Sequence, residues 1–209
     1  TGAENTAVGD LALKANTTGA KNTAVGGNAG AAITTGTFND IFGRAAGFDL
    51  TTGDYNVAIG SNSLANLTTT NDNVAVGHAA LNTVVTGTQN TAIGTCALYT
   101  TTADCGTAIG YQALKANTTG DKNTAVGRNS ASSNTTGSNN VAMGFCSLGA
   151  DTTADHNTAI GFCALKTNTT GTLNTMVGSC SGFAMTTGQQ NSGVGINTFQ
   201  ANTTGSRNS

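Results

Sequence analysis

Apolar residues recur at one fixed place in a short motif that is repeated along the whole chain. The motif is clearest in Asn123–Gly127, which reads Asn-Thr-Ala-Val-Gly and returns at Asn5–Gly9 and Asn22–Gly26. A position that is always apolar and mostly β-branched is typical of the inward face of a β-strand. We therefore predict that the Val of the motif forms the core. This valine column comprises twelve residues: Val8, Val25, Phe42, Ile59, Val76, Ile93, Ile109, Val126, Met143, Ile160, Val177 and Val194.

The glycine that closes each motif gives the period of the repeat. Successive closing glycines are 17 residues apart, except for Gly94 and Gly110, which are 16 apart. A constant period of this size is the signature of stacked repeats. We predict an all-β chain, a parallel β-roll or β-solenoid of about twelve 17-residue coils, each with two short strands. Residues 1–209 would form a single repeat domain, and the incomplete pattern at both ends suggests a segment of a longer fibrous protein.

The second half of each coil most often reads Ala-Leu and then Asn-Thr-Thr-Gly. Gly replaces the Leu at Gly30, Gly47 and Gly182, and apolar residues then appear downstream. They are Ala31 with Ile33, Phe48 with Leu50, and Phe183 with Met185. Close packing requires such compensation if the Leu points into a core.

The Asn that opens the motif recurs in twelve of thirteen places, the exception being Gly106. Stacked coils would bring these amides about 4.8 Å apart, the spacing of neighbouring strands. We predict a ladder of mutually hydrogen-bonded side chains. Its members are Asn5, Asn22, Asn39, Asn56, Asn73, Asn90, Asn123, Asn140, Asn157, Asn174, Asn191 and Asn208.

Composition narrows the possible functions. Charged residues make up 9% of the chain and the net charge is −2, so no basic face for nucleic acid is expected. No run of 18 or more apolar residues exists, so we expect no membrane insertion. Pro is absent, as suits a parallel ladder that uses every backbone N–H donor.

The motif Asn-x-x-x-Gly with its Val and Ala-Leu partners resembles the head repeats of trimeric autotransporter adhesins of the YadA-like family, and related repeats of phage and virus tail fibres. Asn56–Gly60 and Asn140–Gly144 come closest. The resemblance covers essentially the whole chain and implies a left-handed parallel β-roll and a homotrimer. The 17-residue unit is longer than the usual adhesin head unit, and no stalk, neck or membrane anchor lies in these residues.

Cysteine is the most informative chemistry in the sequence. Cys96, Cys146, Cys163 and Cys180 all lie two residues after a closing glycine, the last three in successive coils. Stacked neighbours near 5 Å apart are within the Cα range of a disulfide. Cys105 shares the 16-residue coil with Cys96, so we predict a bridge across that coil. The alternative is buried free thiols; five cysteines favour an oxidising, extracellular setting.

Six sequons make N-glycosylation another hypothesis. Their acceptors are Asn16, Asn66, Asn117, Asn134, Asn168 and Asn202. The alternative is that Asn-Thr-Thr is turn chemistry, because Asn tolerates the left-handed conformation. Ile33, Leu50 and Met185 occupy the same place in other coils, which suggests that this position faces inward.

No pattern in the sequence indicates catalysis. His78 and His156 lie in different coils without a paired nucleophile, and no helix follows the glycines at Gly26-Gly27 that could make a phosphate loop. The turns lack the recurrent Asp of Ca²⁺-binding repeats, and no His or carboxylate pattern accompanies the cysteines. We expect no enzyme activity, no cofactor and no metal site.

Three functions fit these observations. The first is a structural and adhesive extracellular fibre segment on a microbial cell surface or virion, a rigid spacer that self-associates as a homotrimer and contacts a host-surface or glycan receptor. The second is the subunit of a homopolymeric extracellular filament. The third is an ice-binding β-solenoid, because ranks of Thr on a flat face can order water.

Overall fold

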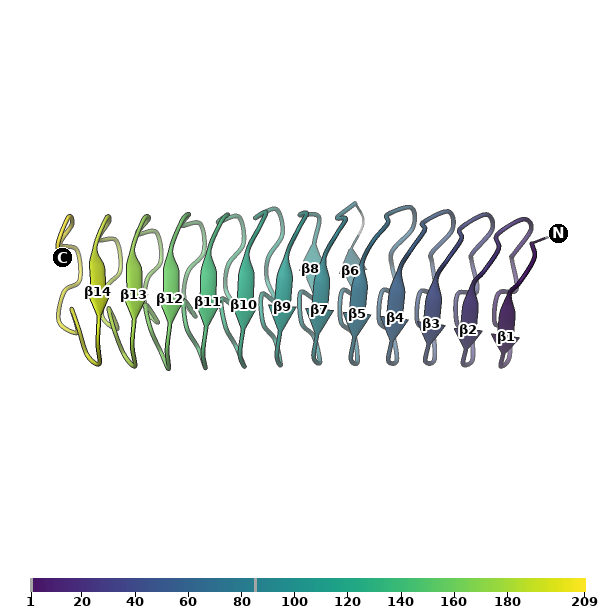
Figure 1. Cartoon of the computed structure of the whole chain (residues 1–209), viewed down its shortest axis with the longest axis horizontal. Helices are drawn as coiled ribbons and strands as arrows, with labels where there is room; N and C mark the ends of the chain where they lie inside the picture. Colours follow the sequence, from purple (N-terminus) through teal and green to yellow (C-terminus); the bar gives the residue numbers. More distant parts are fainter. Residues whose placement is uncertain (1, 85) are drawn as a thin grey trace. The chain divides into compact units, whose positions relative to one another are not determined.

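The computed structural model describes residues 2–84 and 86–209. These residues form two compact units, Thr1–Cys105 and Gly106–Ser209, and each unit is a β-solenoid (Figure 1). The described part of the chain contains no helix that is long and apolar enough to cross a bilayer. The prediction of an all-β parallel solenoid with a repeat of about 17 residues is therefore confirmed.

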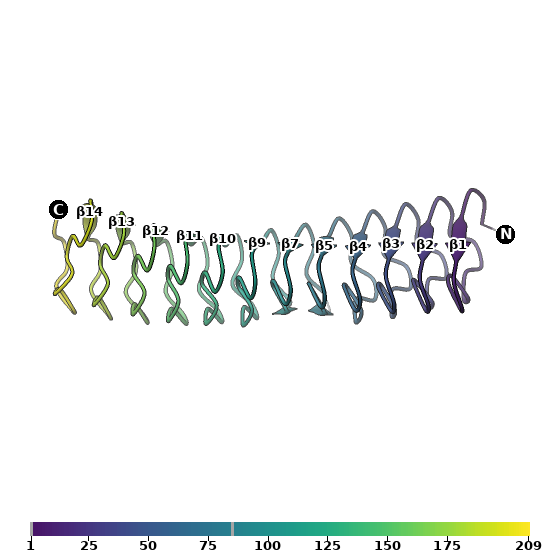
Figure 2. The ribbon, with the colours of Figure 1, turned by 90° about the horizontal axis from the view of Figure 1, so that it is seen from below.

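Each coil contributes one three-residue strand to a parallel sheet. In the first unit the neighbours are β1 (Thr6–Val8), β2 (Thr23–Val25), β3 (Asp40–Phe42), β4 (Val57–Ile59), β5 (Val74–Val76) and β7 (Thr91–Ile93). In the second they are β9 (Thr107–Ile109), β10 (Thr124–Val126), β11 (Val141–Met143), β12 (Thr158–Ile160), β13 (Thr175–Val177) and β14 (Ser192–Val194). Paired residues such as Thr124 and Val141 are one repeat apart, so equivalent side chains of successive coils form columns. Figure 2 shows these strands along one side of the coils within each unit.

The predicted second strand of each coil is wrong for most coils. Among the described residues, only β6 (Thr83–Val84) and β8 (Thr100–Thr101) form such a pair. Elsewhere the second half of the coil turns sharply, because residues such as Cys146 and Leu148 adopt left-handed backbone angles (φ 51° and 52°). Alternating left-handed corners interrupt the extended run that a strand requires.

The closing glycine of the motif is required by two constraints at once. Gly26 has a φ of 137°, and its N–H donates to the carbonyl of Val8 in the preceding coil at 2.8 Å. A Cβ at Gly26 would lie 2.6 Å from the carbonyl oxygen of Gly43 in the next coil. Only glycine fits where coils approach this closely.

The core is formed by the Ala at the centre of each strand and by the Leu of Ala-Leu, and the valine column takes no part in it. Ala58 and Leu64 have no exposed surface, as do Ala142 and Leu148. The Leu is buried even though its backbone is left-handed, as in Leu64 with a φ of 49°. The prediction that the Leu points inward is confirmed.

Volumes at the Ala and Leu positions compensate for each other within a coil. Where Gly47 replaces the Leu, Ile41 replaces the Ala, and a Cβ at Gly47 would lie 2.9 Å from Ile41 Cδ1. Gly193 shows the reverse, because an added Cβ would lie 2.8 Å from the ring of Phe199, which stands at the Leu position. The downstream residues Ile33, Leu50 and Met185 are also buried, as predicted, whereas Phe48 is exposed.

Buried amides satisfy the backbone on the other side of the coil. The backbone N–H of Asn39 donates to Asn22 Oδ1 at 3.0 Å, and Asn39 Nδ2 donates to the carbonyl of Gly53 at 2.8 Å. The same contacts recur at Asn140 and Asn157 in the second unit. The motif Asn therefore joins each coil to the preceding one and also closes its own coil.

The volume compensation can be tested in the fourth coil, where Leu67 already stands in the place of Leu50. We expect Ala58→Ile to destabilise the fold by about 1–3 kcal/mol through overpacking against Leu64. Adding Leu64→Gly should restore most of the loss, because the double variant reproduces the trio Ile41, Gly47 and Leu50. Urea unfolding measures both effects. Additive destabilisation by the two substitutions would contradict the pairing, and the exposed Thr69→Ala is a matched control.

Candidate interaction surface

The valine column faces solvent, which corrects the prediction that it forms the core. The exposed fractions are 56% for Val8, 42% for Ile59, 39% for Ile93, 37% for Ile109 and 36% for Ile160. Since side chains alternate across a strand, the Ala between the motif Thr and Val takes the inward face and both neighbours turn outward. The period-two pattern holds, but its two faces are exchanged.

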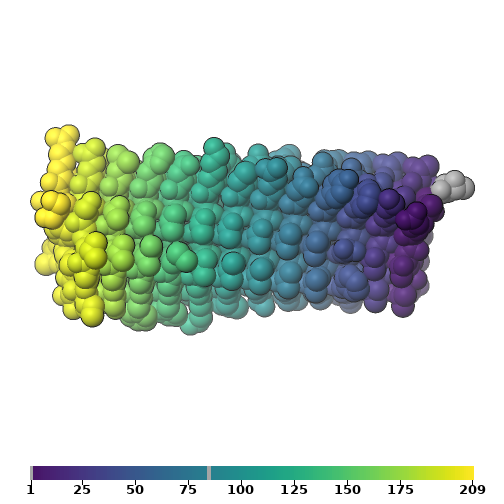
Figure 3. Space-filling view, in the orientation of Figure 1, coloured from purple at the N-terminus to yellow at the C-terminus, as the bar shows by residue number. Residues whose placement is uncertain are grey.

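The exchange has a steric cause. A coil of this length brings its two walls close together, since a Cβ added at Gly47 would lie 2.9 Å from Ile41 on the strand and one at Gly182 would lie 3.0 Å from Met176. A second branched side chain on the strand would overfill this space. The larger residues of the motif therefore stand outside, where they form one apolar column on each unit. Figure 3 shows such rows of side chains running from coil to coil.

A second outward column extends this apolar surface in the Gly106–Ser209 unit. Tyr111, Phe145 and Phe162 each follow a residue of the valine column by two positions and are 45%, 38% and 54% exposed. The guanidinium of Arg128 lies between two of these rings, 5.7 Å from the centroid of Tyr111 and 5.6 Å from that of Phe145. Phe145 stacks on Phe162 with centroids 5.5 Å apart. The rings are therefore packed against one another and against Arg128 while part of each side chain stays exposed to solvent.

The Thr1–Cys105 unit carries a smaller stack at a different corner. Phe38 and Tyr55 stack with centroids 4.9 Å apart, and Lys21 Nζ lies 4.8 Å from the centroid of Phe38. Neither stack is among the features predicted from the sequence. An aromatic at the same place in adjacent coils is the signal that could have found both.

The predicted glycan acceptors divide by burial. Asn117, Asn134 and Asn168 are buried, and each Nδ2 donates to a glycine carbonyl three residues on at 2.9 Å. These three amides are structural and are closed to a glycosyltransferase in the folded chain. Asn16 and Asn202 are half-buried with the same contact, and Asn66 is exposed.

All five cysteines are free, which corrects the prediction of a bridge between Cys96 and Cys105. Cys105 Sγ lies 3.5 Å from Oε1 of Gln89, and Gln89 lies in the turn before β7. Cys96, by contrast, follows β7. The strand separates the two thiols. Cys146, Cys163 and Cys180 do stack in successive coils, but in-register Cβ atoms about 4.8 Å apart exceed the roughly 3.8 Å typical of disulfides.

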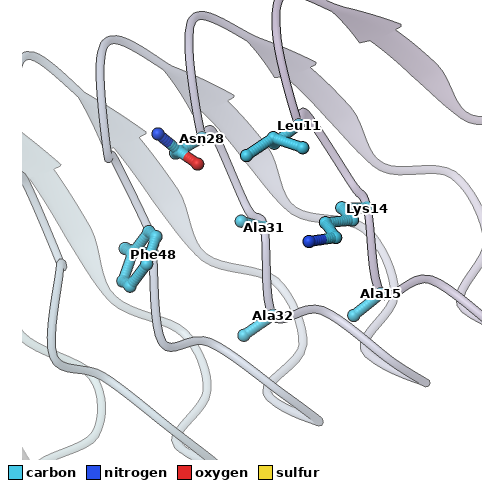
Figure 4. A pocket seen from close by; sticks show the side chains of 7 residues that line it. All are labelled: Leu11, Lys14, Ala15, Asn28, Ala31, Ala32 and Phe48. Atoms are coloured by element: carbon cyan, nitrogen blue, oxygen red, sulfur yellow. The ribbon is translucent and has the colours of Figure 1, made fainter.

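Two shallow recesses lie on the surface of the units. The first has a volume of about 420 Å³, with Leu11 and Phe48 beside a floor of Ala15, Ala31 and Ala32 (Figure 4). Its charged group is Lys14, and no acid–base pair converges there. The second, about 280 Å³, is lined by Cys146 and Lys166 among others. His78 and His156 are exposed in separate units.

One buried carboxyl group interrupts the column of sequon amides formed by Asn117, Asn134 and Asn168. Asp151 has no exposed surface and lies in the coil between those of Asn134 and Asn168. Its Oδ1 accepts the N–H of Ala154 at 3.0 Å, but its Oδ2 has no hydrogen-bond partner among the described residues. The equivalent atom of Asn134 is an Nδ2 that donates to a backbone carbonyl. Burial, and to a lesser extent the charge of Asp155, raises the pKa of Asp151 to about 7.

Comparisons with protein-family models, with curated proteins and with solved structures find no match to this chain.

The buried carboxyl should make the fold more stable in acid. Because the Asp151 pKa is about 7 in the folded chain and near 3.8 when unfolded, the folded state binds the extra proton between these values. The free energy of unfolding should fall as pH rises through this window, by up to about 1.4 kcal/mol per pH unit. Urea unfolding from pH 4 to pH 8 measures this slope.

Asp151→Asn restores the amide donor of the column and should remove this part of the slope while raising stability at pH 8. The exposed Asp121→Asn serves as the control for removing a carboxyl group elsewhere in the same unit. Equal slopes in the wild type and in Asp151→Asn would show that the carboxyl is ionised in the folded chain.

Proposed function

We propose that this chain is a structural segment of an extracellular fibre that assembles with copies of itself through the valine columns. The observation that carries the proposal is an outward apolar residue on every rung of the sheet in each unit, which is exposed on most rungs and half-buried at Val25, Val76, Val126 and Val177. Contiguous exposed apolar surface on a soluble protein usually marks an interaction site. In the strands of the Gly106–Ser209 unit, the outward residues include no charged side chain.

A second copy suits this surface because its geometry is itself periodic. Each rung places an apolar side chain at the strand spacing, and another copy offers the same spacing along its own column. Small coils also gain from such burial, since a 17-residue turn encloses little apolar surface of its own. The resemblance to adhesin heads and tail fibres favours a homotrimer, and a filament of stacked copies is the alternative. The side chains outside the valine columns, such as the aromatic stack around Arg128, would then be free to bind a host-surface or glycan receptor.

Binding to ice is a second candidate for the same face. The motif Thr is the other outward residue of most strands, as in Thr124 beside Val126 or Thr158 beside Ile160. In-register Thr and Val columns form the kind of regular surface that can order water. Asp40 and Phe42 interrupt the regularity in β3, and Met143 does so in β11, which favours self-association.

Charges placed in the column should test self-association. We expect the wild-type chain to sediment at a multiple of its 20.6 kDa mass, with three as the favoured number. Ile109→Lys combined with Ile160→Lys should dissociate the assembly, because an unpaired charge buried in an interface costs several kcal/mol. Analytical ultracentrifugation measures both chains.

The matched control is Thr119→Lys with Thr170→Lys, which adds the same charges at exposed sites away from the column. It should keep the wild-type mass. A monomeric wild type, or an assembly that survives charges in the column, would contradict the proposal. A monomer that also shows thermal hysteresis would support the ice-binding alternative.

A further inference from the structure

Three thiols stand directly above one another in the Gly106–Ser209 unit, and we call Cys146, Cys163 and Cys180 the cysteine column. Backbone hydrogen bonds fix their register, since the N–H of Cys163 donates to the carbonyl of Phe145 at 2.9 Å and that of Cys180 to Phe162 at 2.8 Å. All three residues share the same left-handed backbone, with φ of 51°, 54° and 53°. Their side chains therefore leave the backbone in the same direction, one coil apart.

This spacing suits a bridging cation better than a disulfide. Adjacent coils are about 4.8 Å apart, so thiols in the same rotamer would hold their sulfurs at a similar separation. Cys146 and Cys180 are both close enough to Cys163 to raise the pKa of its thiol. A disulfide would need Cβ atoms roughly 3.8 Å apart. With the zinc–thiolate bond length of about 2.3 Å as a guide, two metal–sulfur bonds in line would span roughly 4.6 Å, close to the spacing of the coils.

We propose that neighbouring thiols of the cysteine column bind one soft monovalent cation, of the Cu(I) or Ag(I) type, in linear two-coordinate geometry. Thiolate is the ligand that such cations prefer. Binding breaks two S–H bonds, forms two metal–sulfur bonds and releases two protons. The bridged unit carries one net negative charge.

The surroundings of the column fit that charge and provide access. Cys163 is 3% exposed, and burial raises the pKa of its thiol, whereas the positive charge of Lys166 lowers it. Lys166 is thus placed to offset the charge of a bridged pair. The recess of about 280 Å³ reaches the column at Cys146 and is lined also by Ser132 and Thr167, so an ion can enter from solvent.

Two-coordinate binding is the mode that the geometry permits. Cys146 and Cys180 are two coils apart, about 10 Å, so no ion can touch both. Within residues 2–84 and 86–209, no group of three or more His, Cys, Asp or Glu side chains is close enough to share an ion. Because both pairs use Cys163, each chain binds one ion tightly.

Because Cys163 lies between the other two thiols, its loss should affect ion binding far more than the loss of either neighbour. Anaerobic titration of the reduced full chain with Cu(I), in competition with bicinchoninate, measures affinity and stoichiometry. Cys163→Ser should weaken binding by about 100-fold or more, above what losing even a supporting residue costs. Cys146→Ser and Cys180→Ser each leave one neighbouring pair and should bind one ion with near wild-type affinity.

Cys96→Ser combined with Cys105→Ser is the matched control and should also bind one ion tightly. The double variant Cys146→Ser with Cys180→Ser keeps the buried Cys163 and should lose the site, which guards against a folding defect of Cys163→Ser. Similar losses in all single variants, or loss in the control, would overturn the proposal. So would rapid formation of a disulfide within the column on exposure to glutathione disulfide, because it would show that the sulfurs approach more closely than the coil spacing.

Discussion

The structure depends on the narrowness of a 17-residue coil, which has room for one layer of side chains between its two walls. An Ala on the strand and a Leu on the other wall are fully buried in this space, as Ala58 and Leu64 show, together with Leu67 of the same coil. Any enlargement on one wall requires a reduction on the other, and the pairs Ile41 with Gly47 and Phe199 with Gly193 obey this rule. The same limit drives the branched residues of the motif outward, so the scarcity of interior volume creates the apolar exterior.

Hydrogen bonds of buried amide side chains stabilise this fold, in which each coil buries less apolar surface than a larger domain does. The motif Asn accepts a backbone N–H from the next coil and donates to a carbonyl of its own, so one side chain serves two coils. Such contacts are worth most where water is excluded, and leaving one unmade is costly. Asp151, which lies between Asn134 and Asn168 in a different column of side chains, shows the cost, because a carboxylate lacks the donor that an amide supplies and one of its oxygens has no hydrogen-bond partner.

A stack of nearly identical coils converts single residues into columns, and chemistry on this protein is therefore a property of columns. An aromatic at one corner becomes a stack with an arginine between rings, as around Arg128. A valine becomes an apolar stripe on the outer face of the sheet. A cysteine becomes a series of evenly spaced thiols. In each case backbone hydrogen bonds between coils set the spacing, so equivalent side chains are evenly spaced, unlike isolated surface residues.

The sequence by itself determined the repeat, the parallel stacking, the inward Leu and the recurrence of Asn, because these follow from periodicity and from the needs of the backbone. It could not decide which side of the strand is buried. Thr-Ala-Val alternates equally well either way, and only the distance between the two walls of the coil excludes Val8 and Ile160 from the interior. Tertiary structure likewise decided whether the cysteines pair. Cys96 follows β7, whereas Cys105 precedes β9 and contacts Gln89, which lies before β7, so the two thiols are apart although they are close in sequence. Periodicity specifies which residues align, whereas the width of the coil specifies which of them the core can hold.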